Sequence, residues 1–220
     1  MNIEWDSIFS ALESWYAIQN GEPAVTMVAS TTGRDPWAIL LSTIVSLRTK
    51  DAVTMVASRK LLAEAPDPMK MDELPEERAA ALVYPAGFYR TKAKNLKKIA
   101  RILLDRYNGQ VPADMNALLA LPGVGRKTAN LVLIEAFDMD GICVDTHVHR
   151  ISNRTGWVCT PEPDKTESAL RHILPIQYWK RINTLLVLYG QNVCTPRWAK
   201  CEICTIAQYC NTGIKVLSLQ

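Results

Sequence analysis

Four cysteines near the C-terminus have the spacing of a metal-binding loop. Six residues separate Cys194 from Cys201, two separate Cys201 from Cys204, and five separate Cys204 from Cys210. Thiolates this close in sequence can bind one metal centre, either an iron–sulfur cluster or zinc. Structural zinc sites usually join two short Cys-x-x-Cys knuckles across a longer insert, so zinc is the alternative that this spacing fits less well.

A second segment, residues 121–130, combines a tight turn with an amine. It reads Leu-Pro-Gly-Val-Gly-Arg-Lys-Thr-Ala-Asn, with Gly123 and Gly125 in the turn. Glycine tolerates the crowded or left-handed backbone of such a turn, and the amides at a helix start can bind a phosphate. Lys127 falls in the first turn of the helix that follows, and a lysine amine can act as a nucleophile. The alternative is an ordinary helix connection with a solvated lysine.

Asp145 is a candidate acid–base residue. It opens the segment Asp-Thr-His-Val-His-Arg at residues 145–150, where it can serve as an N-cap. A capped carboxylate is held in position, so it can also accept a proton or stabilise developing positive charge. His147 and His149 point in different directions on a helix and lack a third metal ligand in the sequence, so neither is assigned a catalytic role.

The elements that position these residues are predicted to be helices, because apolar residues recur at spacings of three and four and not in strict alternation. The fold class is therefore all-α. The helices are expected at residues 5–19, 36–46, 50–65, 75–83, 91–107, 115–120, 126–137, 146–155, 165–174 and 177–193.

One segment, residues 87–101, contains six cations and no acid. On a helix, Lys94 and Lys98 lie on one side, while apolar residues of the same segment face inward. A phosphate-binding stripe and a solvated basic face are both consistent with this pattern. The net charge of +3 for the 220 residues does not choose between them, because phosphate binding depends on where charge is concentrated.

Composition indicates a globular protein that does not cross a membrane. Apolar residues make up 48% and charged residues 21% of the chain, and the longest apolar stretches are far shorter than the ~20 residues of a spanning helix. Residues 1–6 lack the basic start and apolar run of a secretory signal, so a cytoplasmic location is expected, nucleoid-associated in a prokaryote. Thiols stay reduced in that compartment, and Cys143 and Cys159 are therefore expected to be small buried residues.

The segments at residues 121–130 and 144–150, taken together, resemble the core of endonuclease III, a family of the helix-hairpin-helix DNA glycosylase superfamily. The similarity extends from about residue 37 to residue 210, and the cysteine spacing matches the family's [4Fe-4S] loop. The resemblance implies that Lys127 and Asp145 are catalytic and that Cys194, Cys201, Cys204 and Cys210 hold a [4Fe-4S] cluster. It also implies DNA contacts by Arg48, Phe88, Lys94, Lys98, Gly123, Val124, Gly125, Arg126, Arg197 and Lys200.

The architecture implied by the resemblance is two helical lobes. Residues 27–138 would form a helical barrel that carries the hairpin, and residues 1–26 and 139–220 would form the cluster lobe. The expected partner of this monomeric enzyme is double-stranded DNA with a damaged base or an abasic site. The implied reaction removes oxidised or ring-saturated pyrimidines and cleaves the strand by β-elimination through a lysine imine.

Two positions depart from the family pattern. Arg48 stands where many members have a glutamine that enters the space vacated by the flipped nucleotide, and Phe88 stands where a leucine wedge is often found. Arginine donates hydrogen bonds but does not accept them. Preference for the opposite base therefore cannot be carried over from the family.

Two other functions remain open at this point. One is a thymine or uracil glycosylase of the same fold that acts opposite guanine. The other is a non-catalytic iron–sulfur protein that binds damaged DNA through the hairpin. Covalent trapping on abasic DNA with borohydride distinguishes the second from an enzyme, because only an imine can be reduced to a stable link.

Overall fold

The computed structural model of the chain describes residues 3–19 and 21–218. The segment at residues 1–6, in which no secretory signal is expected, lies partly outside the described residues, because Met1 and Asn2 are not among them. Among the described residues the regular elements are helices, and the only β pairing is an isolated bridge between Cys194 and Ala199. None of the described helices is long and apolar enough to span a membrane. The predicted all-α fold class is confirmed.

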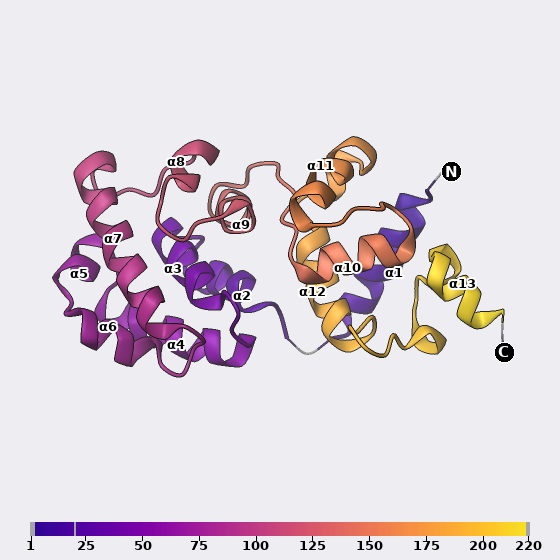
Figure 1. Ribbon diagram of the computed structural model, residues 1–220, viewed down its shortest axis with the longest axis horizontal. Helices are drawn as coiled ribbons and strands as arrows, with labels where there is room; N and C mark the ends of the chain where they lie inside the picture. Colours follow the sequence, from indigo (N-terminus) through magenta and orange to yellow (C-terminus); the bar gives the residue numbers. More distant parts are fainter. Residues whose placement is uncertain (1–2, 20, 219–220) are drawn as a thin grey trace. The chain divides into compact units, whose positions relative to one another are not determined.

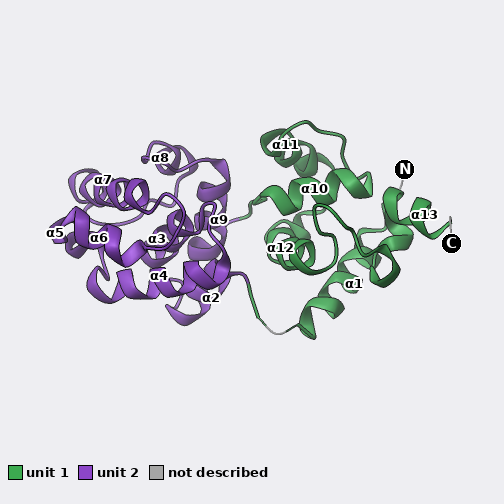
Figure 2. Cartoon of the chain, turned by 60° about the horizontal axis from the view of Figure 1, so that its bottom comes forward, with its two compact units in different colours: residues 1–22, 140–220 green, residues 23–139 purple. Residues whose placement is uncertain are grey.

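The chain divides into two compact units (Figure 2), one formed by residues 1–22 and 140–220 and the other by residues 23–139. The expected division between residues 26 and 27 falls inside helix α2, which begins at Ala24, and the compact units divide before that helix. The chain thus starts in one unit, builds the whole of the other, and returns to complete the first.

Residues 23–139 form a unit of eight helices, shown in indigo to rose in Figure 1. They are α2 (Ala24–Thr31), α3 (Pro36–Ser46), α4 (Asp51–Glu64), α5 (Pro68–Glu73), α6 (Glu76–Val83), α7 (Tyr89–Tyr107), α8 (Met115–Leu119) and α9 (Arg126–Phe137). Helix α3 is the central element, because every residue from Trp37 to Val45 is buried. It packs against α2, α4, α7 and α9. Asp35 fixes its start by accepting a hydrogen bond from the Ala38 amide at 2.7 Å.

The other unit joins the first helix of the chain to its C-terminal part. Its elements are α1 (Trp5–Ala17), α10 (Thr146–Thr155), α11 (Pro163–Ile173), η1 (Ile176–Tyr178), α12 (Ile182–Asn192), η2 (Cys201–Ile203), η3 (Ala207–Tyr209) and α13 (Asn211–Leu217). One apolar core unites α1, α10, α11 and α12, and in it Phe9 and Leu12 of α1 cluster with Ile151 of α10 and Leu186 of α12. Burial of these side chains from distant parts of the chain holds the unit together.

Several predicted helices match the structure, and others need correction. The predicted helix at 177–193 is wrong: the chain forms η1, then a turn in which the Arg181 amide donates to the Tyr178 carbonyl, and only then α12. Tyr178 stacks on Phe9 with ring centroids 4.0 Å apart. This packing on α1 favours the separate short element.

Three helices, α2, α5 and α13, were not predicted from the sequence. Helix α2 is short and contains β-branched residues with low helix propensity, and it is stabilised by packing on α3. Helix α13 contains Gly213, whose amide donates to Cys210 Sγ at 3.3 Å.

The two cysteines outside the cluster spacing differ in burial. Cys159 is exposed, contrary to the expectation that it is buried, whereas Cys143 is buried as expected.

Candidate active site and metal centre

The turn between α8 and α9 presents exposed glycine backbone at the start of a buried helix. Gly123 has φ +77°, and a Cβ at this position would lie 2.6 Å from Asn95 Nδ2. The left-handed backbone conformation therefore favours glycine, and a Cβ would also force the Asn95 side chain to move. Gly125 is the extended residue that precedes the first turn of α9. Val124 is buried, and its amide donates to the Leu121 carbonyl within the turn, so Gly123 and Gly125 are the exposed part of the hairpin.

Lys127 lies in the first turn of α9, directly after Arg126, and both side chains are half-buried. The next residues, from Thr128 to Ile134, are all buried. Beyond its first turn, most of α9 is therefore buried in the unit at residues 23–139. This burial fixes the backbone from which the lysine projects, and the positive end of the helix dipole lies at the same turn.

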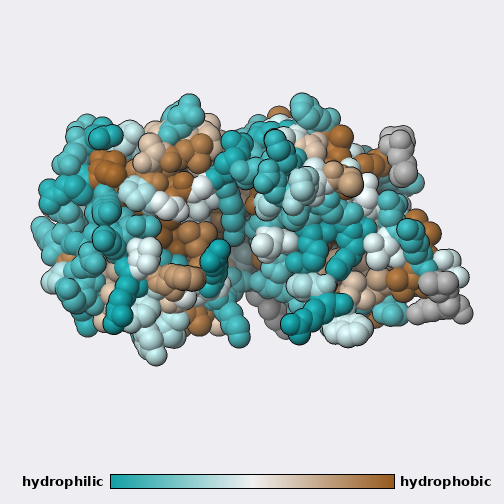
Figure 3. Space-filling view, viewed as in Figure 1, coloured by the Kyte–Doolittle hydropathy of each residue, from teal (hydrophilic) through white to brown (hydrophobic). Residues whose placement is uncertain are grey.

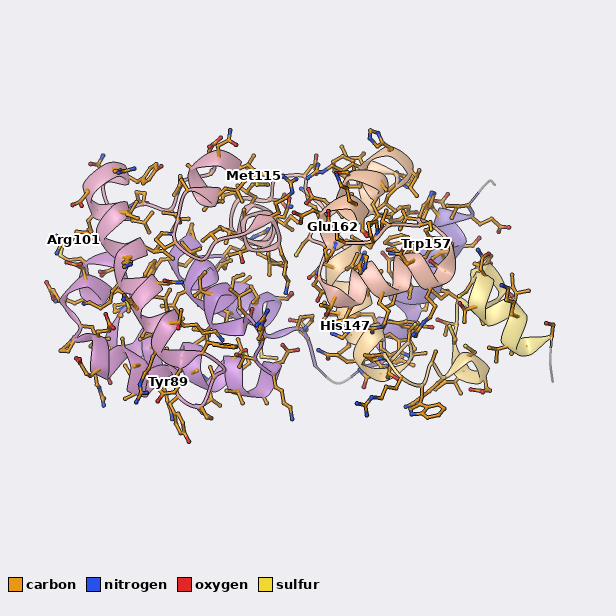
Figure 4. All side chains as sticks on the ribbon, viewed as in Figure 1. Tyr89, Arg101, Met115, His147, Trp157 and Glu162 are labelled. Carbon is orange, nitrogen blue, oxygen red and sulfur yellow. The ribbon has the colours of Figure 1, made fainter. Side chains whose placement is uncertain are left out.

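Asp145 caps helix α10, as the sequence indicates. Its Oδ1 accepts hydrogen bonds from the His147 amide at 2.8 Å and the Val148 amide at 2.9 Å, and the residue is only 9% exposed. Figure 4 labels His147 in the first turn of this helix. His149 Nδ1 lies 2.7 Å from Thr166 Oγ1 on α11. His147 Nδ1 lies 3.1 Å from Arg150 Nη2, so each of the two histidine rings contacts a polar side chain within the same unit.

The four clustered cysteines line one cavity. Together with Arg154, the side chains of Cys194, Cys201, Cys204 and Cys210 line a cavity of about 20 Å³, and none of the four forms a disulfide. The bridge between Cys194 and Ala199 folds the first part of the loop back on itself. Among residues 3–19 and 21–218, no three His, Cys, Asp or Glu side chains converge on one point that could hold a single metal ion. A four-iron cluster does not need such convergence, because each thiolate binds a different iron. The donor set therefore fits a [4Fe-4S] cluster.

Hydrogen bonds from the surrounding protein point to the cysteine sulfurs. Arg154 Nη1 on α10 donates to Cys194 Sγ at 3.3 Å, and the Tyr189 hydroxyl on α12 donates to Cys204 Sγ at 3.2 Å. Burial raises the pKa of Tyr189 above its usual value, which keeps its hydroxyl protonated as a donor. Burial and the neighbouring thiols also raise the pKa of Cys201. Ionisation of Cys201 would therefore need positive charge nearby, which an iron–sulfur cluster would supply.

Arg154 and Tyr189 were not predicted as part of this centre. Arg154 also donates to the Thr195 carbonyl at 2.8 Å, so it connects α10 to the cysteine loop. No local signal identifies either residue, because each reaches the loop across at least fifteen residues of chain. Only the spacing of the cysteines themselves is visible in the sequence.

The lysines and arginines predicted to contact DNA are exposed, except for Arg126, which is half-buried. Lys94 and Lys98 are exposed on α7, and Arg197 and Lys200 are exposed on the cysteine loop. Their neighbour Lys97 is used differently, because its Nζ donates to the Asp72 carbonyl at 2.7 Å. In Figure 3, hydrophilic residues cover much of the visible face, with apolar side chains between them.

Arg48 and Phe88 lie side by side, although they are forty positions apart in the sequence. The Arg48 guanidinium carbon is 5.7 Å from the centre of the Phe88 ring, and Phe88 is 63% exposed. Figure 4 labels the following residue, Tyr89, at the start of α7. A cation over an exposed aromatic ring is a weak contact in water. The pair therefore presents an aromatic surface and hydrogen-bond donors to whatever binds there.

Comparison with known proteins agrees with this geometry. The profile of the HhH-GPD superfamily base excision DNA repair proteins matches residues 41–175. Endonuclease III of Thermotoga maritima is 44% identical over 176 residues, which cover 80% of this chain and 83% of that protein. Endonuclease III of Escherichia coli is 38% identical over 181 residues, covering 82% and 86%.

Among solved structures, a trapped endonuclease III–DNA covalent intermediate superposes with a TM-score of 0.78 and 33% identity. The superposition covers 83% of this chain and 86% of that one. Sequence and fold thus agree over most of the chain. The chain belongs to the HhH-GPD superfamily and, within it, is a base excision repair enzyme of the endonuclease III family, a DNA glycosylase with AP lyase activity.

Proposed function

We propose that the enzyme removes oxidised or ring-saturated pyrimidines from duplex DNA and cleaves the strand at the abasic site through Lys127. The observation that carries this proposal is the position of Lys127 in the first turn of α9, directly after the exposed glycine hairpin. Backbone amides at such a hairpin suit a phosphate. An amine one turn away suits attack on the sugar attached to that phosphate.

In this proposal the damaged nucleotide is first flipped out of the duplex, which costs a few kcal/mol and is cheapest for a weakly stacked lesion. Lys127 Nζ then attacks the sugar C1′: a C–N bond forms, the glycosidic bond breaks, and the base leaves with its electron pair and gains a proton. The nitrogen lone pair then forms the C=N bond as the C1′–O4′ bond breaks, so the sugar ring opens, O4′ takes a proton, and a protonated imine results. Removal of a C2′ proton from the imine then expels the 3′ phosphate by β-elimination.

Asp145 is proposed to assist base release. Its carboxylate is held by two backbone amides of α10, so its position does not depend on a flexible rotamer. It can accept the proton of the attacking amine or stabilise positive charge on the sugar. Capping and chemistry are compatible because the carboxylate has a second oxygen, Oδ2.

Contacts to DNA are proposed for both units. Lys94, Lys98, Arg126, Arg197 and Lys200 would neutralise phosphates without reading sequence, and the amides of Gly123 and Gly125 would bind one phosphate directly. Arg48 and Phe88 would fill the space left by the flipped nucleotide, where an aromatic ring can stack between bases. Each of these side chains is exposed or half-exposed.

A [4Fe-4S] cluster is proposed to bind Cys194, Cys201, Cys204 and Cys210. When bound, it supplies a structural cross-link for the loop and takes no part in base removal. Arg154 and Tyr189 would donate hydrogen bonds to two of the ligand sulfurs, and such bonds orient metal ligands. The folded loop would carry Arg197 and Lys200 towards phosphates. We propose that the enzyme acts as a monomer in the cytoplasm.

Replacement of Lys127 by Ala tests this function. The variant should lose covalent trapping on lesion-containing duplex with borohydride and nearly all strand cleavage, yet retain DNA binding, because the hairpin is unchanged. Lys165→Ala is a matched control, since Lys165 is an exposed lysine in the first turn of α11. Duplexes with dihydrouracil, thymine opposite guanine and uracil opposite guanine would establish the substrate class. Normal trapping by folded Lys127→Ala would refute the assignment of the nucleophile.

A further inference from the structure

Five non-glycine residues of the unit at residues 23–139 have a left-handed backbone conformation, and two of them, Arg48 and Phe88, are in contact. Arg48 has φ +53° and Phe88 has φ +57°. This conformation is unfavourable for residues with a Cβ and persists where the surrounding structure enforces it. Their shared strain and their contact suggest that something fixes together the two short segments that carry them.

The backbones of the two segments are in close contact beside Phe88. A Cβ on Gly87 would lie only 2.9 Å from the Arg48 carbonyl oxygen, so glycine allows an approach that other residues would block. The approach brings the segment after α3 against the start of α7. Close packing alone, however, does not set the conformation of Arg48.

Lys92 supplies the missing constraint. It lies on α7 one turn after Phe88 and is only 5% exposed. Its Nζ donates to the Val45 carbonyl at 2.7 Å and to Thr49 Oγ1 at 2.6 Å. These two acceptors flank Arg48 in the chain on either side, and the Val45 carbonyl belongs to the last turn of α3, where helix carbonyls lack partners within the helix. One amine therefore clamps both ends of the segment that carries Arg48.

Burial of the Lys92 side chain is energetically unfavourable for a charged amine. Its two hydrogen bonds offset part of this cost. Burial lowers the pKa of its amine to about 8, because a charged group loses hydration there. Lys92 also lines, with Arg48, Phe88 and Gly123, a surface hollow of about 300 Å³. The clamp, the contacting pair and the hairpin glycine thus border the same concave surface.

We propose that Lys92 is a positioning residue that holds Arg48 and Phe88 in the arrangement with which they enter damaged DNA. This inference rests on the DNA role proposed above for Arg48 and Phe88. Without the clamp, the segment at residues 46–49 would relax from its left-handed conformation and Arg48 would leave the Phe88 ring. Preference for damaged over intact duplex would fall, while the phosphate contacts would persist.

Four variants of the full-length protein test the proposal. Lys92→Met removes the donors at similar length, and Lys92→Arg restores donors. Thr49→Val removes one of the two acceptors and leaves Lys92 in place. It therefore tests the clamp even if the Lys92→Met variant does not fold. Lys97→Met is the matched control, because Lys97 lies on the same helix and donates to backbone carbonyls away from Arg48. Arg48→Ala and Phe88→Ala are measured alongside to test the underlying DNA role.

Two measurements distinguish positioning from general stability. The first is the ratio of Kd values for intact duplex and for duplex with a tetrahydrofuran abasic analogue, which cannot form an imine. The second is the fluorescence of 2-aminopurine placed opposite the analogue, which rises when the orphan base is unstacked. Urea unfolding of each variant gives its stability independently.

Lys92→Met should abolish the fluorescence rise and lower the Kd ratio on the order of tenfold to a hundredfold, the size expected for loss of one stack between a base and an aromatic ring. Thr49→Val should have the same effects more weakly. Lys92→Arg should recover at least part of both readouts. Lys97→Met should keep both readouts even if it is equally destabilised. Unchanged readouts in Lys92→Met, with losses in Arg48→Ala and Phe88→Ala, would overturn the positioning role alone. Equal losses in Lys97→Met would also overturn it. Unchanged readouts in Arg48→Ala and Phe88→Ala would overturn the DNA role and this inference with it.

Discussion

Asp145 combines a structural role with a proposed chemical one, and two substitutions separate them. Asp145→Asn keeps a side-chain oxygen that can accept from the amides at 2.8 and 2.9 Å, and Asn caps helices about as well as Asp. Its free energy of unfolding should stay within ~0.5 kcal/mol of the wild type. Asp145→Ala leaves both amides without this acceptor and should cost about 0.5–2 kcal/mol.

The chemical effect should be larger than the structural one. General acid–base assistance contributes about 10²–10⁴ in rate, which corresponds to roughly 2.7–5.4 kcal/mol at 1.36 kcal/mol per factor of ten. The Asn variant should therefore lose this factor while remaining folded. The Ala variant should show a similar loss of rate together with its loss of stability.

The assay is single-turnover base release from a dihydrouracil duplex, with urea unfolding followed by circular dichroism and duplex affinity by fluorescence anisotropy. Asp67→Asn is the control, because Asp67 caps α5 by accepting from the Lys70 amide at 2.8 Å and lies outside the proposed site. It should keep its rate within about twofold. A folded Asp145→Asn variant that releases base at the wild-type rate would refute the chemical role and leave Asp145 as a cap only.

Three further predictions concern the cluster, the basic helix and the buried lysine. Anaerobically purified protein should contain about four irons and four sulfides per chain, and Cys204→Ala should lower both iron content and unfolding midpoint; stoichiometric zinc without iron would contradict the cluster. Lys94→Glu or Lys98→Glu should weaken binding to damaged and intact duplexes alike and make the salt dependence shallower by about one unit of slope; an unchanged slope would indicate a solvated face. Because the pKa of Lys92 falls from 10.5 to about 8 on folding, the unfolded chain binds more protons between these values. The free energy of unfolding of the wild type should therefore rise between pH 8 and 10.5 by up to ~1.4 kcal/mol per pH unit. This gain should be lost again as the pH is lowered to about 8. Urea unfolding at several pH values should show no such rise for Lys92→Met.

The sequence by itself determines those features whose cause is local. The helices at Pro36–Ser46, Arg126–Phe137 and Thr146–Thr155 match their predicted ranges because caps, proline and glycine mark their ends. Asp35, Gly125 and Asp145 are the residues that precede their first turns. The cysteine loop can be recognised in the sequence for the same reason, because its four cysteines lie within 17 residues of one another.

Features that arise from contacts between distant segments were decided by the tertiary structure. Helix α2 forms although its sequence favours no helix, because α3 buries one of its faces. The expected helix at 177–193 is interrupted where Tyr178 stacks on Phe9, a residue more than 160 positions earlier in the chain. Local propensity contributes tenths of a kcal/mol per residue, whereas burial of an aromatic side chain contributes about 1.5–3 kcal/mol.

The same distinction applies to the site. Lys127, Asp145 and the cysteines were identified from short motifs, and their DNA and metal roles remain proposals. Lys92 gave no local signal beyond its charge, and the sequence assigned it no role. Its contact with the segment around Arg48 joins residues more than forty positions apart. The amine of Lys92 lies on α7, whereas its two acceptors lie at the end of α3 and just after it. Only packing of these two segments brings donor and acceptors within hydrogen-bond distance.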